Sequence, residues 1–245
     1  MAGVPSRRIL VLRSGGEALP AGDGPGGGVD VLVTHEIVPS PDGISFSLSY
    51  EPAGACLVIS SKTTVQVLVG AGAASIFSAP FASRLAAGAL TAAAMRSAGA
   101  PDVEVPSRPG AAGIVEMIRN NGAAGRFLWP RGSDADTAPF ETLRAAGADL
   151  EDPVVYVKQA RPKLDAEILK AFFAGTYTGI AVASLAALDV FQAAVRAAGQ
   201  ETRVPVRWGV IGPSTAWAFE ERGLPRPLVP ARPRLSDLIA LLQES

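Results

Sequence analysis

The chain has 245 residues, of which 48% are hydrophobic, and its 22 basic and 23 acidic residues leave a formal net charge of −1. A chain of this size and apolar content can bury the core of one large or two modest domains, and its charge balance provides no overall field that would draw it to nucleic acid or to a membrane surface. Cys56 is the only cysteine and His35 the only histidine, which excludes a disulfide framework and a Cys/His zinc site.

The first part of the chain predicts two strands, because residues 7–14 (RRILVLRS) and 28–33 (GVDVLV) are short apolar runs. Between them, residues 15–28 hold seven glycines and two prolines, which predicts a loop because neither residue type sustains a helix. The N-terminus lacks the apolar core and cleavage site of a signal peptide, so we expect a cytoplasmic protein. Residues 36–45 (EIVPSPDGIS) are rich in proline and polar groups and predict a linker.

The middle of the chain begins with an apolar strand at residues 56–61 (CLVISS) that ends in two serines and leads into a helical pattern. Residues 85–99 (LAAGALTAAAMRSAG) predict a strand end, a glycine turn, a helix and a glycine stop. Further strands are predicted at residues 125–132 (GRFLWPRG) and 147–152 (GADLED), the latter followed by PVVYV. Residues 156–165 (YVKQARPKLD) predict a second linker.

The last part of the chain repeats the middle. Residues 179–184 (GIAVAS) match the strand 56–61 at an offset of 123, and residues 209–223 (GVIGPSTAWAFEERG) match residues 85–99 at an offset of 124. The second offset also aligns the amphipathic segments GIVEMI and DLIALL. Each half therefore predicts the order strand, serine, helix, strand, glycine turn, helix.

Strands that alternate with helices predict parallel sheets. We therefore expect an α/β protein of two similar domains, each a parallel sheet flanked by helices, joined by a two-stranded linker. The expected first domain is discontinuous (residues 1–37 plus 160–245), the second covers residues 43–154, and the linkers lie at about 36–45 and 154–163. The tryptophans Trp129, Trp208 and Trp217 are expected to pack between sheets and helices.

Parallel sheets bind ligands beyond the carboxyl ends of their strands. Helix N-termini at that edge offer free N–H groups and partial positive charge, which suit an anion. The side chains and turns that this interpretation places there are Arg13, Ser14, Ser60, Ser61, Gly88, Arg131, Ser133, Ser184, Gly212 and Ser214. We expect the two edges to face a common cleft.

On these residues the chain resembles the uroporphyrinogen-III synthase family. The family has two α/β domains on a two-stranded linker, with turns that read roughly "VG..TA..L...G" and "IGP.TA..L...G". The corresponding stretches here are VISS with AAGALTAAAMRSAG, AVAS with VIGPSTAWAFEERG, and the strand end VVY before the second linker. The chain departs from the family in residues 15–28, where a helix is usual, and in Lys62 and Leu185, which follow the two strand-end serines.

The resemblance implies a cofactor-free, metal-free lyase of tetrapyrrole (haem, sirohaem and cobalamin) biosynthesis. Its substrate would be hydroxymethylbilane, a linear tetrapyrrole with eight carboxylates, which is dehydrated and closed with inversion of ring D. The resemblance also implies a monomer that acts without nucleic acid or membrane, and a transient contact with hydroxymethylbilane synthase.

The resemblance implies roles for particular residues. Tyr156, in the VVY strand, matches the tyrosine implicated in the family as the proton donor to the departing hydroxyl; the alternative is a tyrosine packed into a domain junction. The candidate substrate-binding residues are Thr91, Thr215, Ser61, Ser184, Ser60, Ser214, Gly88, Gly212, Arg13, Lys62 and Arg131. For the hydroxyls the alternative is helix capping, and for the cations it is ordinary surface charge.

Other readings remain open. Asp134 and Asp136 are consistent with acid–base chemistry or magnesium binding, but a solvated loop is the better interpretation because the other half has no counterpart. A strand-end hydrogen bond is preferred over a proton shuttle for His35. The competing functions are a non-catalytic binding or regulatory module of the same shape and an enzyme of the same fold with another substrate.

Overall fold

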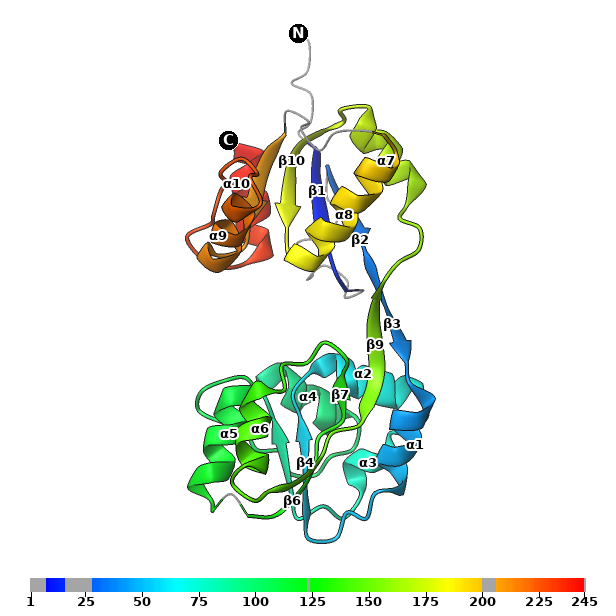
Figure 1. Ribbon diagram of the computed structural model, residues 1–245, viewed down its shortest axis with the longest axis vertical. Helices are drawn as coiled ribbons and strands as arrows, with labels where there is room; N and C mark the ends of the chain where they lie inside the picture. The colour runs from blue at the N-terminus through cyan, green and yellow to red at the C-terminus, as the bar shows by residue number, and fades with distance from the viewer. Residues whose placement is uncertain (1–7, 16–27, 123, 200–205, 245) are drawn as a thin grey trace. The chain divides into compact units, whose positions relative to one another are not determined.

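A computed structural model describes residues 8–15, 28–122, 124–199 and 206–244. The predicted loop at 15–28 therefore lies almost entirely outside the described residues. The chain divides into two compact units, which we call unit 1 (residues 1–36 and 159–245) and unit 2 (residues 37–158). Each unit is an α/β domain with its own parallel sheet, and Figure 1 labels many of the helices and strands of both.

Unit 1 is built on a four-stranded sheet in the order β11-β10-β1-β2. Its strands are β1 (Arg8–Arg13), β2 (Val29–Val33), β10 (Tyr177–Val182) and β11 (Arg207–Val210), and all neighbours are parallel. Its helices are α7 (Ala166–Phe173), α8 (Leu185–Ala197), α9 (Pro213–Glu221) and α10 (Leu235–Glu244).

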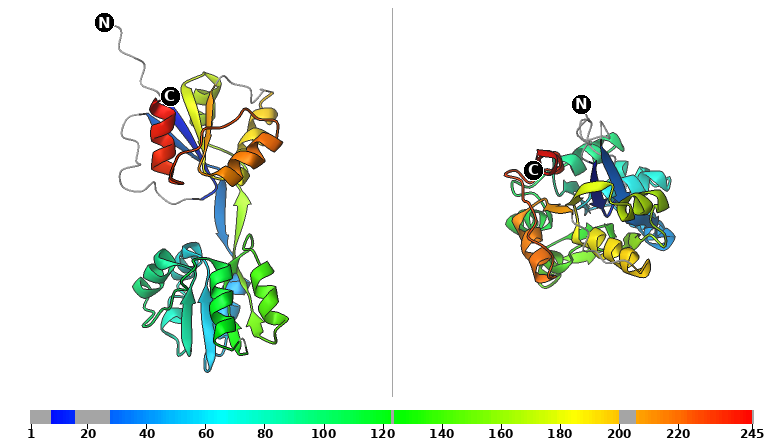
Figure 2. Two further views of the ribbon diagram at one scale, coloured as in Figure 1. Left: turned by 90° about the vertical axis from the view of Figure 1, so that its left-hand side faces the viewer. Right: turned by 90° about the horizontal axis from the view of Figure 1, so that it is seen from above.

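Alternate residues of the unit 1 strands face opposite sides of the sheet, as the period of two requires. Leu10 and Leu12 pack with α7, α8 and α9, whereas Ile9 and Val11 pack with α10. Figure 2 shows α10 on one face of this sheet and the remaining helices on the other. Both faces are buried, which explains why these strands are continuous apolar runs in the sequence.

Unit 2 repeats this plan with the sheet order β5-β4-β6-β8. Its strands are β4 (Ala55–Ile59), β5 (Ser83–Ala86), β6 (Arg126–Leu128), β7 (Arg131–Gly132) and β8 (Asp149–Glu151), of which β7 belongs to a separate small sheet. Its helices are α1 (Pro41–Ser49), α2 (Lys62–Gly70), α3 (Ser75–Ser78), α4 (Ala89–Ser97), α5 (Ala111–Asn120) and α6 (Ala138–Arg144). Leu57 and Ile59 pack with α2, α3 and α4, and Val58 packs with α5 and α6.

The small sheet has the order β3-β9-β7, with β3 at His35–Pro39 and β9 at Val154–Ala160. Ser40 N–H donates to Val155 O at 2.9 Å, and Arg161 N–H donates to Thr34 O at 2.9 Å, so β3 and β9 run antiparallel. These strands carry the two boundaries between the units. The predicted linker 36–45 is therefore strand β3 in its first part and the start of α1 in its second, whereas most of the predicted linker 154–163 is strand β9. Val38 on β3 and Val157 on β9 are both exposed.

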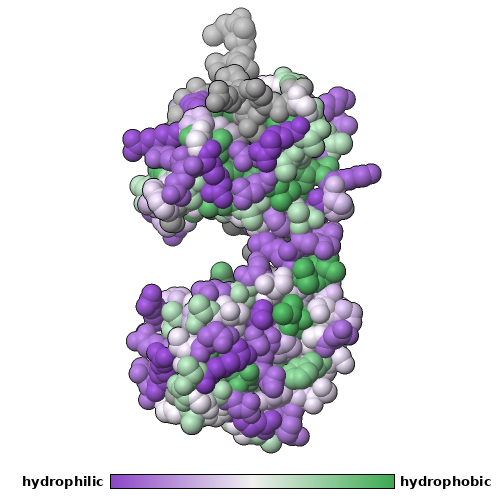
Figure 3. Space-filling model, in the orientation of Figure 1, coloured by the Kyte–Doolittle hydropathy of each residue, from purple (hydrophilic) through white to green (hydrophobic). Residues whose placement is uncertain are grey.

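The surface of unit 2 near β9 and α1 carries apolar side chains among polar ones (Figure 3). Phe46 on α1 is 43% exposed, so this helix is only partly covered. The prediction that all three tryptophans are packed is wrong for one of them: Trp129 and Trp208 are buried, but Trp217 is 66% exposed on α9. No helix among the described residues is long and apolar enough to cross a membrane.

Candidate functional site

The strand-end serines of unit 2 lie where β4 gives way to α2. Ser61 is the N-cap of α2, and its Oγ accepts a hydrogen bond from Thr63 N–H at 3.1 Å. Ser60 Oγ accepts a hydrogen bond from Trp129 Nε1–H at 2.9 Å. In both bonds the hydroxyl acts as an acceptor, and a hydroxyl also carries a donor. Capping and ligand binding are therefore compatible at these two residues.

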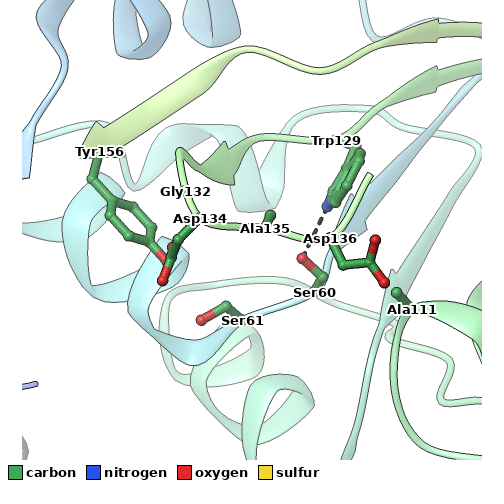
Figure 4. A pocket seen from close by; sticks show the side chains of 9 residues that line it. All are labelled: Ser60, Ser61, Ala111, Trp129, Gly132, Asp134, Ala135, Asp136 and Tyr156. Carbon is green, nitrogen blue, oxygen red and sulfur yellow. Dashed lines mark hydrogen bonds between the residues drawn. The ribbon is translucent and has the colours of Figure 1, made fainter. Parts of the chain in front are cut away.

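A pocket of about 280 Å³ opens at this edge of the unit 2 sheet. Its walls come from the residues that follow β4 and β6, the start of α5, the turn after β7, and β9 (Figure 4). The lining residues are Ser60, Ser61, Ala111, Trp129, Gly132, Asp134, Ala135, Asp136 and Tyr156. The structure thus brings Ser60, Ser61 and Tyr156 together, three residues that the sequence analysis selected.

Tyr156 extends from β9 into this pocket and is 6% exposed. Burial raises the pKa of its phenol above the ordinary value, and the negative charge of Asp134 acts in the same direction. Hydrogen bonding from the hydroxyls of Ser61 and Thr64 opposes that rise in pKa. Thr64 Oγ1 is itself buried, and within the described part of the chain it has no hydrogen bond of good geometry. The phenol is therefore kept in its protonated form beside polar groups.

Two carboxylates stand in the turn that follows β7. Asp134 pairs with Lys158 Nζ at 3.2 Å, and Asp136 Oδ1 accepts a hydrogen bond from Ala138 N–H at 3.0 Å at the start of α6. Both are exposed, as the predicted solvated loop requires, and both also line the pocket. The described residues include no cluster of three or more His, Cys, Asp or Glu side chains suited to a metal ion.

Arg131 is the candidate cation nearest to this turn. Its Nε pairs with Asp152 Oδ2 at 2.7 Å, and its guanidinium lies 5.7 Å from the centre of the Trp129 ring. Asp152 also pairs with Arg144 at 2.7 Å, so one carboxylate serves two cations. Lys62 is the first residue of α2 and is half-buried.

The glycine turns precede one helix in each unit. Gly88 is the N-cap of α4 and Gly212 is the N-cap of α9; both are extended, and neither helix has a side-chain cap. A Cβ at Gly212 would meet no atom within 4 Å. Crowding therefore does not require glycine at Gly212, and the backbone N–H groups at the start of α9 have no side-chain cap.

The candidate threonines follow these turns. Thr91 is the third residue of α4 and is only 8% exposed, whereas Thr215 is the third residue of α9 and is half-buried. In unit 1, Ser184 caps α8 without a side-chain hydrogen bond. Arg13 ends β1, and its carbonyl accepts hydrogen bonds from Thr34. The side chain of Ser214 lies outside the described residues.

Residues 25–240 match the family model described as uroporphyrinogen-III synthase HemD. The chain belongs to the uroporphyrinogen-III synthase family. The resemblance found in the sequence is thereby confirmed, and with it the enzyme class, a cyclising lyase of tetrapyrrole biosynthesis. No curated protein sequence matches the chain.

Two solved structures are similar to the chain. The uroporphyrinogen-III synthetase of Helicobacter pylori 26695 has 17% sequence identity and a TM-score of 0.64, with 96% of this chain and 97% of that chain covered. A mutant uroporphyrinogen III synthase of the extremely thermophilic bacterium Thermus thermophilus has 17% identity and a TM-score of 0.54, with 98% of each chain covered. At this identity the likeness supports the two-domain α/β fold that the sequence predicted.

Six of the nine residues that line the pocket were not selected as site residues: Ala111, Trp129, Gly132, Asp134, Ala135 and Asp136. The signal was present for two of them, because Trp129 directly follows β6 and Gly132 ends β7, and ligands bind at the ends of parallel strands. The buried thiol of Cys56 is not a candidate nucleophile, because burial raises its pKa to about 11.

Proposed function

We propose that this chain dehydrates and cyclises hydroxymethylbilane to uroporphyrinogen III, with Tyr156 as the proton donor. The observation that carries the proposal is a buried phenol in a polar pocket at the carboxyl edge of a sheet, in a chain that belongs to this family. Tyr156 would protonate the hydroxyl that leaves ring A, which departs as water. The carbocation-like azafulvene that remains is attacked by the substituted carbon of ring D.

The spiro intermediate formed by this attack fragments and closes again with ring D inverted. The final product forms when the ring carbon that made the new bond loses a proton and the pyrrole regains aromaticity. The reaction as a whole releases one water. The proton that Tyr156 donates in the first step is therefore balanced by the proton that the ring carbon loses in the last step. The phenolate of Tyr156 is the base that we propose for that return.

The carboxylates of the substrate need hydrogen-bond donors. We propose that Ser60 and Ser61 bind them at the pocket and that the turns at Gly88 and Gly212, with Thr91 and Thr215, bind them at helix N-termini. A hydrogen bond to a charged group contributes about 1.5–3 kcal/mol, so a few such contacts suffice for a nearly neutral protein. Ser184, Ser214, Arg13, Lys62 and Arg131 are proposed as further ligands of carboxylates.

For Arg131 the proposal carries a condition. Its guanidinium is paired with Asp152, so a substrate carboxylate would have to share the cation with that aspartate. A bidentate guanidinium has five N–H donors and can serve two carboxylates. Arg131 is therefore proposed to bind substrate without breaking its ion pair.

The test is the isomer composition of the product. Hydroxymethylbilane is supplied to the full chain, the product is oxidised, and type I and type III porphyrins are separated. We expect type III product from the wild type and a loss of about 100- to 10,000-fold in kcat for Tyr156→Phe. Tyr50→Phe is the matched control, because Tyr50 is a tyrosine of the same unit outside the pocket.

Two outcomes would contradict the proposal. Type I product at the spontaneous rate would leave a binding module of the same fold or an enzyme of that fold with another substrate. Undiminished activity of Tyr156→Phe, with type III product, would keep the reaction and remove Tyr156 as its proton donor.

We also propose that the protein is a cytoplasmic monomer that meets hydroxymethylbilane synthase transiently to receive its substrate. A single cysteine, free and buried, fits a reducing compartment. Light scattering on the purified chain tests the monomer, and a mass of two chains or more would contradict it.

A further inference from the structure

Gly132 faces the ring of Tyr156 at close range. A Cβ built on Gly132 would lie 2.6 Å from Oη and 2.6 Å from Cε2 of Tyr156, and would also collide with Cζ. Real Cβ atoms do not approach other atoms so closely, so any side chain at this position would occupy the place of the phenol. The three atoms nearest to that Cβ all belong to Tyr156.

The backbone on both sides of this contact is held by hydrogen bonds. Gly132 pairs with Tyr156 between β7 and β9, and the register of this pair shifts next to Arg131. Arg131 N–H donates to Pro153 O at 3.0 Å, and Ser133 N–H donates to Tyr156 O at 3.0 Å. Because β7 and β9 are fixed before and after Gly132, the strands cannot slide apart at small cost.

The turn after Gly132 is fixed to β9 as well. Lys158 N–H donates to Ser133 Oγ at 3.4 Å, and Lys158 Nζ pairs with Asp134 at 3.2 Å. Lys158 and Tyr156 are two residues apart on the strand, so their side chains share one face. A side chain added at Gly132 would therefore displace the end of the tyrosine ring, which is the movable part of the contact.

The backbone conformation does not explain the glycine. Eleven described glycines have a positive φ, which favours glycine, and Gly132 is not among them. What Gly132 provides is space. We propose that Gly132 is a positioning residue that sets where the phenol of Tyr156 stands in the pocket; the inference rests on the proposed role of Tyr156 as proton donor.

The direct test is Gly132→Ala in the full chain. An acid displaced by about 1 Å can lose about 100-fold in rate, so we expect kcat to fall by about 100-fold, with KM changed much less. Gly70→Ala is the matched control: Gly70 ends α2 in the same unit, and a Cβ there would meet nothing within 4 Å. We expect Gly70→Ala to keep the activity of the wild type.

A double-mutant cycle separates positioning from general damage. In the Tyr156→Phe background there is no phenolic proton to misplace, so adding Gly132→Ala should lower kcat by less than about threefold. An equal loss of kcat in both backgrounds would overturn the inference, and so would unchanged kcat for Gly132→Ala in the otherwise native chain.

If Gly132→Ala destabilises the fold, a second variant without the tyrosine ring still tests the inference. Because the three atoms nearest to the added Cβ all belong to Tyr156, the pair Gly132→Ala with Tyr156→Leu should unfold at the same urea concentration as Tyr156→Leu alone. A lower midpoint for the pair would overturn the inference. Failure of the proposed function has a different signature: the wild type would then give only type I product at the spontaneous rate. Failure of the role of Tyr156 alone would leave Tyr156→Phe fully active whatever Gly132→Ala does.

Discussion

The two units share one frame and differ in the side chains placed on it. The sheet orders β11-β10-β1-β2 and β5-β4-β6-β8 correspond strand by strand. The match extends to isolated bridges, since Leu85 bridges Glu104 in unit 2 and Gly209 bridges Leu228 in unit 1. Both pairs of residues are related by the offset of 124 that the sequence shows.

Equivalent positions at the carboxyl edges of the two sheets are occupied by different types of residue. By the offset of 123, Ser60 corresponds to Ala183, and by the strand registers Trp129 corresponds to Val11. Unit 2 therefore has a hydrogen-bonded pair, Trp129 with Ser60, where unit 1 has two apolar residues. Because unit 1 lacks both the donor and the acceptor, these positions leave no buried polar group unsatisfied in either unit.

The position of the proposed acid, Tyr156, is also occupied by a different residue in unit 1. Leu128 pairs with Glu151 and Leu10 pairs with Asp30, so continuing each strand makes His35 the counterpart of Tyr156. His35 Nδ1 lies 2.9 Å from Thr34 Oγ1, the strand-end hydrogen bond that the sequence favoured. The comparison teaches that duplication supplied the scaffold and that a few substitutions made one edge the proposed catalytic one.

The largest expected effects are losses of stability on substituting Leu85 and Gly209, which are equivalent positions in the two sheets. Leu85 is 5% exposed, so Leu85→Ala should lower the free energy of unfolding by about 2–5 kcal/mol. A Cβ at Gly209 would lie 2.6 Å from Leu238 Cδ1, so Gly209→Ala should cost about 1–3 kcal/mol through overpacking. Urea denaturation measures both; a stabilising Gly209→Ala would show that α10 does not need the glycine.

The polar pair at the pocket is tested by Ser60→Ala. Trp129 is fully buried, and without its acceptor the indole N–H is unsatisfied, which costs about 1–3 kcal/mol. Combining Ser60→Ala with Trp129→Phe removes donor and acceptor together, so the double variant should lose less stability than the sum of the single variants. Additive losses would mean that the hydrogen bond does not couple the two residues.

The strand-end serines provide a smaller contrast. Ser61 caps α2 through its side chain, so Ser61→Ala should cost about 1 kcal/mol of unfolding free energy. Ser184 makes no such bond, and Ser184→Ala should leave stability nearly unchanged. The same denaturation experiment compares them, and equal losses would contradict the difference between the caps.

The smallest expected effect is electrostatic. Burial and, after it, the charge of Asp134 raise the pKa of Tyr156, so Asp134→Asn should lower that pKa. The charge that acts on the phenol is that of Asp134 in the turn, and the partner of Asp134 is Lys158 on β9. The ultraviolet absorbance of the phenolate, taken as the difference from Tyr156→Phe, reports the titration.

A raised pKa also predicts how Tyr156 affects stability. The unfolded phenol loses its proton near pH 10, whereas the folded one still holds it. The contribution of Tyr156 to stability is therefore complete below about pH 10 and falls as the pH rises through its folded pKa. Asp102→Asn, a change at an exposed carboxylate outside the pocket, is the control and should leave the phenolate titration where it is.

Most of the fold could be predicted because its signals are local. The apolar runs of β1, β4 and β10, the serines after β4 and β10 and the glycine turns before α4 and α9 depend on neighbours in the chain. The paired linkers could be predicted as segments, but not that they form a sheet with β7. The exposure of Trp217 on α9 could not be predicted, because composition does not tell which side of a helix meets solvent.

By itself, the sequence determined the duplication, the family, the two α/β units and the candidates Tyr156, Ser60 and Ser61. Only the tertiary structure decided that Trp129 donates to Ser60 across 69 residues, that Asp134 pairs with Lys158 and that Gly132 makes room for the phenol. Strands and turns are set by residues adjacent in the chain, whereas these contacts exist only once separate strands are brought side by side. A glycine has no side chain from which its role could be predicted, so that role can be inferred only from the atoms packed against it.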